Sequence, residues 1–96
     1  MLELADYILA HHERWDGAGY PKGLLGEAIP MVARIIAIAD SYDAMTSERP
    51  YRKVLSENSV LAEIRNNAGT QFDPKIARIF IEKVLNQQWN KYEHIS

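Results

Sequence analysis

The sequence predicts an all-α fold, a helical bundle of about four helices with a long loop that contains glycine and proline. Two observations predict it. Apolar residues recur at helical spacing in four separate segments, and no segment of useful length alternates apolar and polar residues as a strand does. With 96 residues, of which 47% are apolar, the chain can form one small domain, or part of one, and not two.

The first predicted helix covers residues 2–12, where apolar residues at helical spacing lead to His11 and His12 on the last turn. Residues 13–29 follow as a long loop, because four glycines and a proline interrupt any helical pattern there. Loops of this length in compact domains are often functional. We therefore expect the loop to contribute to a site.

The second predicted helix begins with Pro30 in its first turn and ends at Thr46. Apolar residues cover almost its whole surface, so we expect it to be buried on most sides. A charged run around Pro50 separates it from the third predicted helix, residues 56–67, with Ser56 as its N-cap.

The last predicted helix begins after Gly69, which ends the third helix. Asp73 and Pro74 have the residue types expected of an N-cap and a first helical residue. The apolar stripe that follows predicts a helix to about residue 89, and the polar tail 90–96 lies beyond it.

Composition excludes several classes of function. A formal net charge of -2 argues against the broad basic surface that binds polymeric nucleic acid. No apolar run approaches the ~18 residues that a membrane span needs, so we expect no membrane partner and a soluble, cytoplasmic protein. The chain has no cysteine, so any metal must be held by His, Asp or Glu, which suit iron or manganese.

The adjacent histidines His11 and His12 are the first candidates for chemistry. At a helix end both imidazoles can turn toward one metal cluster, although neighbours inside a helix diverge by about 100°. The alternative is that they only complement the negative end of the helix dipole.

Two aspartates on the second predicted helix are the next candidates. Asp40 and Asp43 lie three residues apart on one face of the most apolar helix, and a carboxylate buried there needs a metal or a cation. The alternative is that one aspartate pairs with Arg34 or Arg49 and that no metal is bound.

Three longer strings around these residues resemble one family. They read HHERWDGAGYP at 11–21, IADSYDAMTS at 38–47 followed by RPYR at 49–52, and NAGTQFDP at 67–74. In order and spacing they resemble the HD-GYP family, the bacterial branch of the HD phosphohydrolases. Members are helical domains that hydrolyse cyclic di-GMP, a signalling molecule, with two or three iron or manganese ions.

The resemblance implies roles for individual residues. His11, His12 and Asp40 match metal ligands. Asp43 matches a catalytic position beside the metals, where it would orient a ligand or a water. The residues that match contacts to the cyclic dinucleotide are Tyr20, Arg49 and Arg52, whose structural alternatives are a packed loop tyrosine and two solvated arginines.

One departure from the family lies upstream. The resemblance implies that a complete site needs an earlier histidine, a His-Asp dyad and a further histidine, all before Met1, and His94 in the tail is a poor substitute. We therefore expect residues 1–96 to be the C-terminal part of an HD-GYP-type domain, with a partial HD-domain fold. Alone it should bind metal weakly or not at all and be inactive as a phosphodiesterase.

Two other functions stay open from the sequence. One is a non-catalytic module that binds a signalling protein through the loop Gly19-Tyr20-Pro21, and another is a plain helical bundle whose motifs match by chance. Stoichiometric metal and turnover of a cyclic dinucleotide would separate the enzyme from the module. We also expect a homo-oligomer, because the helix from Pro30 to Thr46 is apolar on more faces than three neighbouring helices can cover.

Overall fold

The computed structural model describes residues 12–48, 50–51 and 53–90. These residues contain no strand, only two isolated bridges between loop residues, so the predicted all-α class is confirmed. The first predicted helix lies outside the described residues except for His12. The elements observed are the 3-10 turn η1 (Gly26–Ala28), the α-helices α2 (Met31–Thr46), α3 (Glu57–Asn67) and α4 (Pro74–Ile79), and the π-helical turn η2 (Phe80–Val84).

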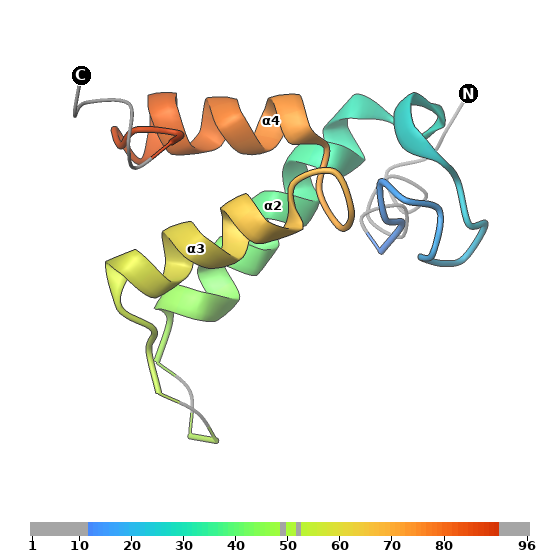
Figure 1. The fold of residues 1–96 in the computed structure, drawn as a ribbon. Coiled ribbons are helices and arrows are strands. Elements are labelled where there is room, and N and C mark those ends of the chain that lie inside the picture. Colours follow the sequence, from blue (N-terminus) through green and yellow to red (C-terminus); the bar gives the residue numbers. More distant parts are fainter. Residues whose placement is uncertain (1–11, 49, 52, 91–96) are drawn as a thin grey trace.

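Each of the three α-helices contacts the other two. The long loop before α2 lies at the end of the bundle where α2 begins, near the connection between α3 and α4 (Figure 1). The connection between α2 and α3 extends away from the helices at the other end. All three helices contribute to one core, which also includes a residue before α4 and one in η2; its buried members are Ile38, Val60, Leu61, Ile64, Phe72, Ala77 and Ile81.

Both predicted helix caps are present. The Ser56 hydroxyl accepts a hydrogen bond from the backbone N–H of Ser59 at 3.2 Å, at the start of α3. The Asp73 carboxylate accepts from the backbone N–H of Lys75 at 2.9 Å and of Ile76 at 3.4 Å, at the start of α4. These acceptors satisfy amides that have no partner within their own helix, which is why the helices begin at these residues.

The last helix is shorter than predicted. It widens into η2, where the N–H of Leu85 donates to the carbonyl of Phe80 five residues earlier, and Asn86 at φ 55° then turns the chain. Arg65 of α3 binds the carbonyls of Gln88 and Trp89 at 2.6 Å each. The side chain of Arg65 thus holds the segment that was predicted to continue the helix.

The expectation that α2 is buried on most sides is wrong. Only Ala33 and Ile38 of this helix are buried, and Met31, Val32 and Ile35 are between 46% and 62% exposed. Among the described helices α3 and α4 contact α2, and they leave Met31, Val32 and Ile35 exposed. No helix among the described residues is long and apolar enough to cross a membrane.

Candidate functional site

His12 and Asp40 line the same pocket. The pocket has a volume of about 190 Å³ and lies between the start of the long loop, α2 and the α3–α4 connection; its other lining residues are Glu13, Arg14, Ala37, Ser41 and Gln71. Ala37, Asp40 and Ser41 follow one another at helical spacing on a single face of α2. Two candidate metal ligands that are 28 positions apart in the sequence are thereby brought to one place.

Asp40 and Asp43 are both exposed, so the expectation of a buried carboxylate on this helix is wrong. Within the described ranges the Asp40 carboxylate makes no hydrogen bond or ion pair with protein. Asp43 does not line the pocket, and its carboxylate accepts from the Ser47 hydroxyl at 2.9 Å. A further cation or polar ligand can therefore approach Asp40 without displacing a protein partner.

Three candidate residues, His11, Arg49 and Arg52, lie outside the described residues. Among the residues that are described, no group of three His, Asp or Glu side chains is close enough together to hold a metal ion. The described part of the candidate site is therefore one imidazole and one carboxylate. Tyr20, the remaining candidate, is placed beside the imidazole.

The Tyr20 ring stacks on the His12 ring. The ring centroids are 4.8 Å apart and the planes differ by 12°, and the Tyr20 N–H donates to the His12 carbonyl at 3.3 Å. The preceding residue must be glycine, because a β-carbon on Gly19 would collide with the Arg14 nitrogen and the His12 carbonyl oxygen. The loop therefore folds back on His12 and limits the orientations of its ring.

The buried Glu13 carboxylate stabilises this loop by accepting hydrogen bonds from two of its backbone amides. Its side chain is only 4% exposed, and its two carboxylate oxygens accept from the backbone N–H groups of Lys22 and Leu24, at 2.7 Å each. Hydrogen bonds to an ionised acceptor are stronger than neutral ones and offset the cost of burying the charge. Sequence reasoning missed this role; the available signal was an acidic residue beside a glycine-rich loop whose amides have no helical partners.

Arg14 and Asp16 form a bidentate pair at the edge of the pocket. The Nε–Oδ1 distance is 3.2 Å and the Nη2–Oδ2 distance is 3.0 Å, and Asp16 Oδ1 also accepts from the Ala18 N–H. The hydrogen bond from Arg14 holds the pKa of the Asp16 carboxyl below its ordinary value, and the Ala18 N–H acts in the same direction. The Arg14 guanidinium therefore already has an ionic partner in Asp16.

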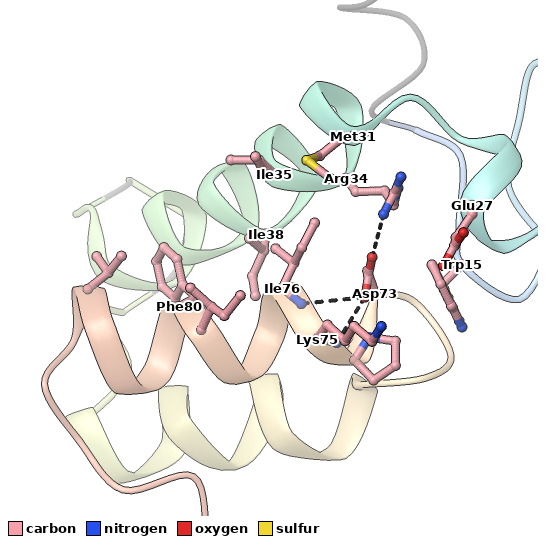
Figure 2. Close-up of a pocket in the computed structure, with 13 residues that line it drawn as sticks. Trp15, Glu27, Met31, Arg34, Ile35, Ile38, Asp73, Lys75, Ile76 and Phe80 are labelled. Carbon is pink, nitrogen blue, oxygen red and sulfur yellow. Dashed lines mark hydrogen bonds and ion pairs between the residues drawn. The ribbon is translucent and has the colours of Figure 1, made fainter.

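A buried ion pair fixes the base of the loop to the helices. Arg34 Nη1 of α2 lies 2.7 Å from Asp73 Oδ2, and Arg34 Nε donates to the Ile29 carbonyl at 2.9 Å. The Arg34 guanidinium also lies 6.0 Å from the centre of the Trp15 ring (Figure 2). The alternative that Arg34 pairs with Asp40 or Asp43 is therefore wrong, since its partner is Asp73.

A larger cavity of about 560 Å³ lies on the neighbouring face of α2. Its walls are mostly aliphatic and aromatic side chains of α2, α4 and η2, and the Arg34–Asp73 pair lies between these side chains and those of Glu27 and Trp15 (Figure 2). Its charged lining residues are Glu27, Arg34, Asp73 and Lys75. The smaller pocket, which holds His12 and Asp40, is therefore the better candidate for metal and phosphate chemistry.

Comparison with known proteins gives one consistent family. Residues 1–76 match the model of a family described as HD domain. The cyclic di-GMP phosphodiesterase response regulator of Xanthomonas campestris is 52% identical over 67 residues, which are 70% of this chain and 18% of that protein. A cyclic di-GMP phosphodiesterase of Thermotoga maritima is 42% identical over 78 residues, or 81% of this chain and 21% of that protein.

A solved structure is also similar. The crystal structure of a cyclic GMP-AMP-specific phosphodiesterase of Vibrio cholerae matches with a TM-score of 0.71 and 34% sequence identity, over 85% of this chain and 18% of that chain. The chain thus spans about a fifth of the length of these relatives. The chance-match alternative is excluded by these findings.

Proposed function

The chain belongs to the HD domain family, in its HD-GYP branch, and from this premise we propose that residues 1–96 are the C-terminal part of a cyclic-dinucleotide phosphodiesterase domain. The observation that carries the proposal is the shared pocket of His12 and Asp40. Relatives named as acting on cyclic di-GMP and on 3'3'-cGAMP both match, so the proposed substrate class is the cyclic dinucleotide.

The donor set fits a divalent metal. An imidazole and a carboxylate that has no partner among the described residues, with no thiolate anywhere in the sequence, suit iron or manganese. We propose His11, His12 and Asp40 as the ligands. When bound, the metal supplies Lewis-acid charge for the phosphoryl oxygens.

The surrounding residues orient this site. Tyr20 limits the His12 ring by stacking, and the two hydrogen bonds accepted by Glu13 hold the loop that carries Tyr20. Tyr20 itself is 62% exposed, so its ring edge and hydroxyl are accessible to a dinucleotide. We propose Tyr20, Arg49 and Arg52 as substrate contacts, because a guanidinium group can bind two phosphate oxygens at once through two parallel hydrogen bonds. We propose Asp43 as a residue that orients a metal ligand or a water.

The isolated chain is expected to be inactive. Its sequence contains three histidines, of which His94 is the one outside the proposed site, so too few ligands remain for two or three metals. Metal affinity should be weak for the same reason. A second messenger is encountered in the cytoplasm, so a cytoplasmic location accompanies this proposal.

Calorimetric titration with Mn²⁺ and a hydrolysis assay with cyclic di-GMP test the proposal together. We expect weak binding that is lost in His12→Ala and Asp40→Ala and kept in Glu48→Ala, an exposed carboxylate that is not in the pocket. Equal binding by all four proteins would contradict the ligand assignment. Turnover by the isolated chain that disappears in Asp40→Ala would contradict its inactivity.

The second candidate function is a module that binds a signalling protein through the loop Gly19-Tyr20-Pro21. One observation favours it, the exposure of Tyr20 and Pro21 on the surface of a loop held by Glu13. Substitution of Tyr20 by alanine would then abolish capture of the partner protein while metal binding stays unchanged. If the chain is instead part of a phosphodiesterase domain, Tyr20→Ala should weaken binding of the dinucleotide.

A further inference from the structure

The α3–α4 connection is joined to the loop that carries His12. The N–H of Trp15 donates to the Gln71 carbonyl at 3.2 Å, and the N–H of Asp16 donates to the Thr70 carbonyl at 2.9 Å. Both donors belong to residues that follow His12 by only a few positions. These two hydrogen bonds fix the backbone of Gln71 relative to the histidine.

The residues after Gln71 are held just as firmly. Phe72 and Asp73 are each 4% exposed, and the Phe72 N–H donates to the Asn67 carbonyl at 3.0 Å. Asp73 caps α4 and pairs with Arg34 of α2 at 2.7 Å. Gln71 is therefore a polar residue in a segment whose backbone has little freedom to move away from the pocket.

The side chain of Gln71 is available for a ligand. Gln71 is half-buried and lines the pocket that contains His12 and Asp40. Its carboxamide offers two N–H donors and one carbonyl acceptor, and within the described part of the chain it makes no side-chain hydrogen bond. A few convergent polar groups of this kind are what fix the orientation of a ligand in a pocket.

We infer that the Gln71 side-chain amide donates a hydrogen bond to a phosphate oxygen of a cyclic dinucleotide bound at this pocket. The inference rests on the proposed function and adds a contact that the sequence motifs did not assign. The neighbouring cation of the pocket, Arg14, is engaged by Asp16. A neutral donor also adds no positive charge beside a divalent metal held by His12 and Asp40.

The test uses the 96-residue chain, labelled with ¹⁵N, and cyclic di-GMP with Mg²⁺ as a diamagnetic ion. Nuclear magnetic resonance detects binding even when it is weak. The side-chain amide resonances of Gln71 should shift as ligand is added, and those of Gln88, an exposed glutamine outside the pocket, should not. A Gln71 amide that stays in place at saturation would overturn the inference.

Matched variants complete the test. Gln71→Ala should weaken binding about tenfold to a hundredfold, the range of one hydrogen bond to a charged acceptor. Gln71→Glu should weaken it further, because it replaces the donor by a negative charge, and Gln88→Ala should leave it unchanged. Backbone spectra that superpose on the parent spectrum away from the pocket establish that each variant is folded.

The outcomes separate the two proposals. If His12→Ala abolishes binding while Gln71→Ala binds as the parent chain does, the inference is wrong and the proposed function stands. If the parent chain binds no dinucleotide at millimolar concentration, the inference is wrong, and the Mn²⁺ titration of the parent, His12→Ala and Asp40→Ala then decides the proposed function separately.

Discussion

Replacing Asp73 by alanine should destabilise the fold more than any exposed substitution. Asp73 is 4% exposed, caps α4 through two backbone amides, and pairs with Arg34 at 2.7 Å. Loss of a helix cap costs about 1 kcal/mol. Removal of one partner from a buried ion pair costs about 3–5 kcal/mol, because the other charge stays buried without compensation.

Only part of that second cost should apply, since the Arg34 side chain is 12% exposed and also binds the Ile29 carbonyl. We therefore expect the free energy of unfolding to fall by about 3 kcal/mol, which for a domain of this size lowers the midpoint temperature by more than ~10 °C. Urea denaturation followed by circular dichroism measures the first quantity, and a thermal scan measures the second.

Two further variants separate the cap from the charge. Asp73→Asn keeps a capping oxygen and removes the ion pair, and should be less harmful than Asp73→Ala. The double variant Arg34→Met with Asp73→Asn leaves no uncompensated charge and should be more stable than Asp73→Asn alone. A loss below ~1 kcal/mol in Asp73→Ala, or a double variant less stable than the single one, would refute the reasoning.

Three other predictions concern the loop, the pH dependence and self-association. Gly19→Ala should lower the free energy of unfolding by about 1–3 kcal/mol, as overpacking does, because its β-carbon meets backbone atoms of Arg14 and His12; denaturation equal to the parent would contradict this. Since the folded pKa of Asp16 is lowered, the stability from its pairing with Arg14 is present above the ordinary value of 3.8 and lost as pH falls through the folded value. A carboxyl titration by ¹³C resonance should show a lower midpoint for Asp16 in the parent than in Arg14→Ala, and equal midpoints would contradict it. The chain should form a twofold dimer through the exposed apolar residues of α2 and α4, because ~400 Å² of apolar surface left in water forgoes about 10 kcal/mol of stabilisation. Light scattering should show the dimer at micromolar concentration and a larger monomer fraction for Ile35→Glu. A parent chain that is a monomer of 11.0 kDa would contradict this prediction.

The parts of the fold that the sequence predicted depend on local rules. Ser56 and Asp73 begin helices because their side chains reach amides two or three residues away, which a reader of the sequence can anticipate. The π-helical end of the last helix was not predictable in this way. It is followed by Gln88 and Trp89, whose carbonyls accept hydrogen bonds from Arg65, a residue more than twenty positions earlier than either.

The parts that were missed depend on contacts between distant segments. The apolar surface of α2 suggested burial, but burial is decided by which elements lie against a helix, and among the described helices α3 and α4 contact α2 and leave Met31, Val32 and Ile35 exposed. The partner of Arg34 is 39 positions away, and no periodicity points to it. Glu13 resembles any charged loop residue until the fold places two backbone amides against it.

The candidate site was predicted from resemblance more than from residue physics. The His-His pair and the two aspartates each had an ordinary structural explanation, and the order of the motifs decided between the explanations. The structure then brings His12 and Asp40 to one pocket, which helical spacing alone could not predict because the two residues belong to different elements. The roles of all seven candidate residues, His12, Asp40 and Tyr20 included, stay predictions.

Paramagnetic broadening by Mn²⁺ tests the central claim, that His12 and Asp40 form a metal site, most directly. At a Mn²⁺ concentration far below that of the protein, the backbone resonances of Ala37, Ser41 and Gln71, which line the pocket, should lose intensity first, and those of Val84 in η2 should keep theirs. Asp40→Ala should abolish this selectivity, whereas Glu48→Ala should preserve it. Broadening that centres on other acidic residues, or that is unchanged in Asp40→Ala, would contradict the account.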